Sequence, residues 1–106
     1  MLLFFLGIMT EAYCYILFSK KLNRYYIGAT AGSVEERLQQ HLSKLYGGLS
    51  FTAKADDWKI FLEISCDSLS MALKMEKFIK RMKNRAFIER LSQDDELVNS
   101  LKQRFA

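Results

Sequence analysis

The chain of 106 residues contains no proline, one tryptophan, one histidine and two cysteines. It has no repeat and no low-complexity linker, and its length predicts a single domain. Cys14, Cys66 and the single histidine, His41, lack the paired spacing of a structural zinc site, which excludes that class of protein. Both cysteines lie in apolar, strand-like runs. We therefore expect free, buried thiols in a reducing compartment.

Long hydrophobic runs are also missing. The apolar stretch in MLLFFLGIMTEAY, at the start of the chain, is far shorter than a membrane span. No lysine or arginine precedes it and no small-residue cleavage site follows, which argues against a secretion signal. We interpret residues 1–12 as an apolar extension packed on the domain, with a start at Met9 as the alternative. We expect a cytoplasmic protein that does not bind membranes.

The composition is that of a soluble globular domain, with 50% hydrophobic and 26% charged residues. The formal net charge of +4 suits a polyanionic partner without requiring one. Alternating apolar residues predict three strands, over 13–19, 25–30 and 58–65. Helical periodicity predicts four helices, over 34–46, 69–82, 85–91 and within 92–106.

Capping patterns support the ends of these helices. Ser33 with Glu36, and Ser92 with Asp95, form capping-box patterns that predict where the first and last helices start. The first helix should end before Gly47. The order β-β-α-β-α-α-α predicts an α+β, sandwich-like fold, in which a small, three-stranded, mainly antiparallel sheet is flanked by helices. We expect the last helix to pack on this domain.

Some polar residues fall inside apolar helical stripes. His41 points into the edge of the apolar stripe of the first helix, and Arg37 lies one turn before it. Taken one at a time, these two residues are better explained as a core-edge histidine and a solvated charge than as site residues. On the second helix, Glu76 falls between the residues that we expect to face the core, namely Leu69, Ala72, Leu73 and Ile79. A carboxylate there must form an ion pair, with Lys80 or Arg37, or bind a metal ion.

The predicted hairpin YCYILFSKKLNRYYIGAT, 13–30, carries four tyrosines. A four-residue loop, KKLN, would pair Leu17 with Tyr26 and Tyr15 with Gly28. Because strand side chains alternate between faces, Tyr13, Tyr15 and Tyr26 would then share one face. The opposite face would carry Cys14, Ile16 and Tyr25. A loop of odd length would separate Tyr15 from Tyr26.

These residues resemble the motifs of the GIY-YIG nuclease superfamily, particularly its small, stand-alone bacterial members. That group is also similar to the nuclease domain of the bacterial excision-repair endonuclease. The first motif is degenerate, because Tyr13-Cys14-Tyr15 stands where Gly-Ile-Tyr would be, whereas the second is intact as Tyr26-Ile27-Gly28. The remaining elements follow in order, and they are Arg37, His41, the segment FTAKADDW and Glu76. The resemblance covers residues 13–91.

The resemblance implies a divalent-metal-dependent endonuclease that hydrolyses phosphodiester bonds. It implies that Glu76 holds one Mg²⁺ or Mn²⁺ and that Tyr15 is the general base for the attacking water. A free phenol has a pKa of about 10, so this base needs help from its neighbours. Tyr26 would orient the water or a phosphate oxygen, Arg37 would clamp the scissile phosphate, and His41 would tune the base.

One element of the family is not matched. The larger enzymes carry an asparagine about three turns after the glutamate, and Ile88 stands near that place here. Asn84 is the nearest candidate. The rival interpretation is a catalytically weak or inactive nucleic-acid-binding module with the same fold. A third is an accessory protein that docks to a partner through its N-terminal extension or its last helix.

Basic residues are spread over several predicted elements. Those that could follow a phosphate backbone are Lys20, Lys21, Arg24, Lys54, Lys77, Lys80 and Arg81. A solvated surface is the alternative. Nothing in the sequence provides base-edge readout, so we expect little sequence preference. The sequence does not decide between DNA and RNA, and we take DNA as the substrate, with RNA as the alternative. We expect a monomer, with a homodimer as the alternative.

Overall fold

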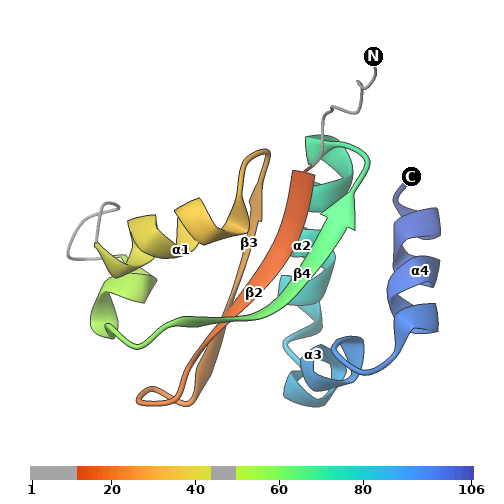
Figure 1. The fold of residues 1–106 in the computed structure, drawn as a ribbon. Coiled ribbons are helices and arrows are strands. Elements are labelled where there is room, and N and C mark those ends of the chain that lie inside the picture. Colours follow the sequence, from red (N-terminus) through yellow and green to blue (C-terminus); the bar gives the residue numbers. More distant parts are fainter. Residues whose placement is uncertain (1–11, 44–49) are drawn as a thin grey trace.

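The computed structural model describes residues 12–43 and 50–106. One antiparallel sheet has the strand order β3-β2-β4 and is built from β2 (Ala12–Ser19), β3 (Arg24–Thr30) and β4 (Lys59–Cys66). One side of it carries α1 (Val34–Leu42) and the short 3₁₀ helix η2 (Phe51–Lys54). The other side carries α2 (Leu69–Met82), α3 (Arg85–Leu91) and α4 (Asp95–Arg104) (Figure 1). The predicted α+β fold is confirmed.

Some predictions concern residues outside the described part of the chain. These are the course of the extension through residue 11 and the end of the first helix beyond Ser43. Ala12, which we assigned to the extension, is the first residue of β2 and is buried. No helix within 12–43 and 50–106 has the length and apolar character needed to span a membrane.

The hairpin has the predicted register. Its loop is KKLN, and Leu17 pairs with Tyr26 while Tyr15 pairs with Gly28. Asn23 closes the loop with φ of 54°, a left-handed conformation that asparagine tolerates. Arg85 of α3 donates to the Asn23 carbonyl and side-chain oxygens at 2.9 and 2.6 Å. Helix α3 therefore anchors the KKLN loop. The length of this loop determines which tyrosines share a face of the sheet.

The two faces of the sheet build two separate cores. The face under α2 is apolar, and the buried strand residues there include Cys14, Ile16, Ile27 and Ile64. The face under α1 buries Tyr15, Leu17, Val34, Leu38 and Trp58. The thiols of Cys14 and Cys66 are free and buried, as predicted. The predicted alternation of tyrosines between faces is also confirmed, since Tyr13 and Tyr26 pack in the second core and Tyr25 in the first.

Helix α2 presents a different face to the core from the one we predicted. Its buried residues are Met71, Ala72, Met75 and Ile79. Leu69 and Leu73 are each 42% exposed, so their placement in the core was wrong. Leucine and methionine are similarly apolar, and the flexible methionine side chains fill the space above β2. Ala72 and Ile79 face the core as expected.

Helix α4 begins later than its predicted capping box. Its N-cap is Asp94, whose carboxylate accepts a hydrogen bond from the backbone N–H of Leu97 at 3.0 Å. Ser92 instead ends α3, and its hydroxyl donates to the Glu89 carbonyl at 2.7 Å. The predicted cap at Ser92 was therefore wrong. A carboxylate caps a helix as well as a hydroxyl does and also interacts with the helix dipole.

Candidate active site

The centre of the site is a hydrogen bond between a strand and a helix. The Tyr15 hydroxyl lies 3.1 Å from Nε2 of His41. The two side chains are only 2% and 3% exposed. Helix α1 is capped by Ser33, which accepts from the N–H of Glu36 as predicted, and it docks on the sheet through Val34 and Leu38. That docking places His41, at the C-terminal end of the same helix face, over Tyr15.

Gly28 makes room for the Tyr15 ring. It lies directly opposite Tyr15 in the strand register. A Cβ built on Gly28 would stand 2.5 Å from both Cζ and Oη of Tyr15, well inside van der Waals contact. The glycine of the second motif is therefore required by the close approach of a side chain from the neighbouring strand.

Tyr26 forms the outer wall of the site. Its ring meets the His41 ring edge to face, with centroids 4.8 Å apart, and lies 6.4 Å from the Tyr15 ring. It is half-buried, whereas Tyr15 lies beneath it. The ring of Phe51, in η2, is nearly parallel to the Tyr26 ring, with the centroids 6.3 Å apart. The two phenols predicted as site residues thus converge on one histidine, one in the core and one nearer solvent.

A second hydrogen bond holds His41 from the other ring nitrogen. Nδ1 lies 2.8 Å from the hydroxyl of Thr52, which is 2% exposed. The backbone carbonyl of Thr52 in turn accepts from Nε1–H of the buried Trp58 at 2.8 Å. We assigned no role to Thr52 from the sequence. The family resemblance included the segment FTAKADDW, which contains Thr52. No periodic pattern within that segment distinguishes Thr52 from its neighbours.

Arg37 lies on the same helix as His41, one turn earlier. Its Nε donates to the hydroxyl of Thr30 at 3.2 Å, and Thr30 is buried at the end of β3. Burial and then the nearby Arg37 guanidinium lower the pKa of His41 below its usual 6.5. At neutral pH the imidazole is therefore uncharged, and one of its nitrogens can accept a proton.

Glu76 approaches the site from the other side of the sheet. Its carboxylate forms an ion pair with Lys80 at 2.8 Å, and its side chain is 17% exposed. The Lys80 ammonium also lies 5.9 Å from the centre of the ring of Tyr26, which belongs to the edge strand β3. The ion pair with Lys80 that the sequence left open is present, and it connects Glu76 to the tyrosine site around the edge of β3.

The oxygen chemistry of this carboxylate fits a hard divalent cation. Within the described ranges, no three residues of the types His, Cys, Asp and Glu gather into a metal-binding cluster. Zinc prefers several nitrogen or sulfur ligands, so Glu76 does not suit it. Mg²⁺ usually keeps several waters and takes one or two carboxylates together with substrate phosphates, which Glu76 can satisfy. Lys80 competes for the same carboxylate oxygen.

The predicted nucleic-acid-binding residues lie in separate places. Arg24 and Lys80 line a cavity of about 230 Å³ between β3, α2 and α3, together with Lys83 and Arg85. This cavity follows the edge strand beside the site. At the hairpin loop, Lys20 is exposed and Lys21 pairs with Asp56 at 2.9 Å. The Lys54 ammonium lies 5.3 Å from the centre of the Phe51 ring.

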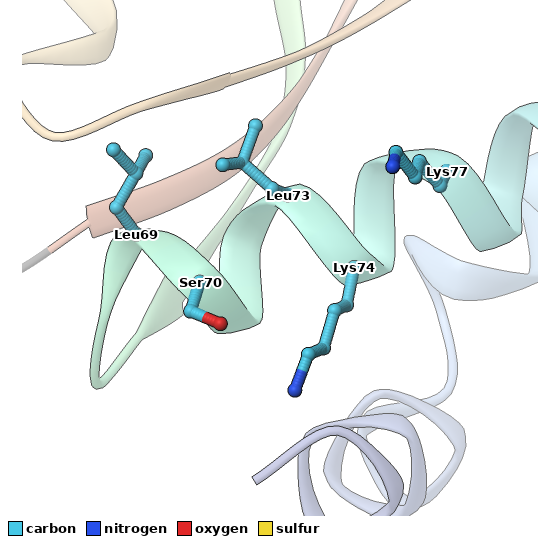
Figure 2. Close-up of a pocket in the computed structure, with 5 residues that line it drawn as sticks. All are labelled: Leu69, Ser70, Leu73, Lys74 and Lys77. Atoms are coloured by element: carbon cyan, nitrogen blue, oxygen red, sulfur yellow. The ribbon is translucent and has the colours of Figure 1, made fainter.

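Lys77 and Arg81 line cavities along α2. Lys77 shares a cavity of about 340 Å³ with Leu69, Leu73 and other residues of α2. Figure 2 shows the two leucines pointing to the same side of the helix, with Lys74 pointing away from them. Arg81 lines a second cavity of about 210 Å³ together with Arg104 of α4.

Asn84 and Ile88 have structural roles. The Asn84 side chain caps α3 by accepting from the N–H of Phe87 at 3.0 Å. Ile88 is 7% exposed and belongs to the apolar core under α2.

Comparison with known protein families identifies the family of this chain. The family model of the GIY-YIG catalytic domain matches residues 11–90, which is most of the chain. The protein therefore belongs to the GIY-YIG family, a family of nucleases that generally depend on divalent metal ions. Neither the curated proteins nor the solved structures gave a match.

Proposed function

We propose that this protein is a divalent-metal-dependent endonuclease that hydrolyses the phosphodiester bonds of DNA, including structured or single-stranded DNA. The observation that carries this proposal is the buried hydrogen bond between Tyr15 and His41. Buried polar groups cost stability unless they are paired, and well-packed apolar side chains of similar volume would avoid that cost. A phenol held against an uncharged imidazole, with an arginine beside them, is suited to activating water.

In this mechanism Tyr15 is the general base. As its oxygen takes a proton from the attacking water, its own proton moves to Nε2 of His41, 3.1 Å away. The lowered pKa of His41 keeps that nitrogen able to accept a proton at neutral pH. The water oxygen then bonds to phosphorus as the bond to the leaving 3′ oxygen breaks.

Arg37 and Tyr26 position the phosphate. The Nε bond to Thr30 fixes the direction of the Arg37 side chain, whose planar fork matches two phosphate oxygens. The half-buried Tyr26 lies between the buried base and solvent, where its hydroxyl can orient the water or a phosphate oxygen. Glu76 would hold Mg²⁺ or Mn²⁺, which when bound supplies charge stabilisation at the phosphate and at the leaving oxygen.

The cationic cavity along the edge strand is the surface that we expect to meet the substrate first. Arg24, Lys80, Lys83 and Arg85 surround it, and Lys80 also reaches Tyr26. A nucleic-acid backbone bound along this edge would therefore continue into the site. Lys77 and Arg81 would extend the contact along α2, whereas Lys20, Lys21 and Lys54 would contact nucleic acid from the loops. These contacts are to the backbone and carry no base sequence information.

A second candidate function is a nucleic-acid-binding module with weak or no turnover. The ion pair between Glu76 and Lys80 favours it, because an ammonium 2.8 Å from the carboxylate competes with a metal ion for the same oxygen. This module would keep the cationic surface and lose cleavage.

The test is cleavage of a mixed panel of labelled DNAs and RNAs with Mn²⁺, Mg²⁺ or EDTA. Wild type, Glu76→Ala and the control Glu96→Ala are assayed together, since Glu96 is an exposed carboxylate in the first turn of α4. We expect metal-dependent cutting that Glu76→Ala loses and Glu96→Ala keeps. Cutting by Glu76→Ala at saturating Mg²⁺ would remove Glu76 as the metal ligand. Binding without cutting by any of the three proteins would favour the binding module.

A further inference from the structure

We propose that Thr52 is a positioning residue for His41. In this proposal the Thr52 hydroxyl accepts a hydrogen bond from Nδ1–H of His41, which leaves the Nε2 lone pair directed at Tyr15. Only the catalytic consequence of this proposal rests on the proposed function. The position of the ring proton is a property of the folded protein and can be measured without any substrate.

The geometry around the imidazole leaves little freedom. Thr52 and Tyr15 approach opposite nitrogens of the ring, at 2.8 and 3.1 Å. All three side chains are at most 3% exposed. The threonine backbone is held by Trp58 Nε1–H at 2.8 Å, and Trp58 is itself 2% exposed. The hydroxyl is thus fixed in place by a helical turn and by a buried tryptophan.

Two arrangements of protons are consistent with these distances, and chemistry favours one. An uncharged imidazole carries one N–H and one lone pair, so each hydrogen bond must use a different group. A phenol is a strong donor and a poor acceptor, whereas an imidazole lone pair is a strong acceptor. Tyr15 therefore donates to Nε2, and Nδ1 carries the proton, for which the Thr52 oxygen is the acceptor.

This arrangement matters for the reaction. When His41 takes the Tyr15 proton on Nε2, the ring becomes an imidazolium that carries N–H groups on both nitrogens. The Nδ1–H bond to Thr52 persists through that step and strengthens as the ring becomes charged. With the proton on Nε2 instead, that nitrogen could not take a proton from Tyr15. Thr52 would thus act through His41 and without touching the substrate.

The decisive measurement is the proton position on the ring, made by ¹⁵N NMR on protein labelled at histidine. His41 is the single histidine of the chain, so the two ring nitrogens give an unambiguous pair of signals. Spectra are recorded near pH 8, where the ring is uncharged, for wild type, Thr52→Val and Thr52→Ser. Valine keeps the shape and removes the acceptor, while serine keeps the hydroxyl.

We expect the proton on Nδ1 in wild type and in Thr52→Ser, and a shift toward Nε2 in Thr52→Val, because a buried N–H without an acceptor is costly. A wild-type proton on Nε2, or a Thr52→Val spectrum like that of wild type, would overturn the proposal. The wild-type spectrum alone decides the first point even if Thr52→Val fails to fold.

Cleavage assays give the second readout. At metal sites, removing the hydrogen-bond partner of a ligating histidine costs about 10- to 100-fold. We expect a loss of similar size in Thr52→Val, with recovery in Thr52→Ser. If wild type does not cut any substrate, the proposed function fails while the NMR result still stands. If wild type cuts and Thr52→Val cuts equally fast, the positioning role fails while the proposed function stands.

Discussion

The two faces of one small sheet are buried in different ways. Under α2, strand residues such as Ile16 and Ile27 pack against methionines and isoleucines in an apolar core. Under α1, the buried residues include His41 and Thr52, and both are hydrogen-bonded. The alternation of side chains along a strand is sufficient to separate these two environments. A short hairpin can therefore stabilise the fold on one face and present reactive groups on the other.

Equivalent residue types behave differently on the two faces. Tyr25 and Tyr26 are neighbours in β3, yet Tyr25 donates to the exposed Glu89 at 3.0 Å while Tyr26 packs on His41. Burial on the apolar face raises the pKa of the Cys14 thiol to about 12, which makes it unreactive. Position relative to the sheet, more than residue type, decides which side chains can do chemistry.

A large effect on the α1 face is expected from Gly28→Ala. The new methyl group would overlap Cζ and Oη of Tyr15, so the ring must move. Misplacement of about 1 Å can cost on the order of 100-fold in rate, and overpacking typically costs about 1–3 kcal/mol of stability. Gly32→Ala is the control, because its nearest neighbour is the Glu36 carboxylate at 3.7 Å. Equal cleavage rates for the two variants would contradict the steric account.

The matching change on the α2 face is Ile16→Ala, at a residue with no exposed surface. We expect a loss of about 2–5 kcal/mol in the free energy of unfolding, measured by urea titration, because the substitution leaves a cavity. Under conditions where circular dichroism shows the variant folded, its cleavage rate should stay close to that of wild type. A folded Ile16→Ala protein without activity would show that the two faces are not independent.

A smaller effect is expected from lowering the pH. The pKa of His41 is lowered in the folded protein, so between that value and the unfolded value of about 6.5 the unfolded chain binds more protons. The free energy of unfolding should therefore fall as the pH drops below about 6.5, and cleavage should fall as the imidazole becomes charged. Thermal unfolding of wild type and His41→Gln between pH 7.5 and 5.5 tests this. Identical pH slopes would contradict the buried, uncharged histidine.

The smallest effect is expected from Tyr25→Phe. The lost hydrogen bond to Glu89 lies at the surface and should contribute less than about 1 kcal/mol. The ring would keep its packing under the Arg85 guanidinium, which lies 5.1 Å from the ring centre. Chemical denaturation measures the difference, and a loss of several kcal/mol would mean that this edge of the sheet contributes more to stability than we infer.

Periodicity was sufficient to predict the fold and most of the contacts within the hairpin. The four-residue loop determined that Tyr15 and Tyr26 share a face, and the structure has that register. The apolar stripe of α1 likewise predicted that His41 faces inward. These are local properties, set by a spacing of two along a strand and of three to four along a helix.

Contacts between distant segments were harder to predict. Nothing in the pattern of FTAKADDW distinguishes Thr52, because its role depends on where η2 docks against α1. The buried side of α2 was misassigned for a related reason, since Leu73 and Met75 are both apolar and only packing against the sheet selects between them. The sequence left Glu76 with two interpretations, an ion pair or a metal ligand. Its partner depends on whether a metal ion is bound, which the sequence pattern does not determine.

The most direct test of the separation between the two faces is single-turnover cleavage by Tyr15→Phe and Tyr25→Phe beside wild type, with Mn²⁺ and a substrate that wild type cuts. Each change removes one hydroxyl from one side of the same hairpin. We predict that Tyr15→Phe slows cleavage by about 10²- to 10⁴-fold, the usual contribution of a general base, while Tyr25→Phe cuts at the wild-type rate. Cleavage by Tyr15→Phe at the wild-type rate, or an equal loss in both variants, would contradict the account.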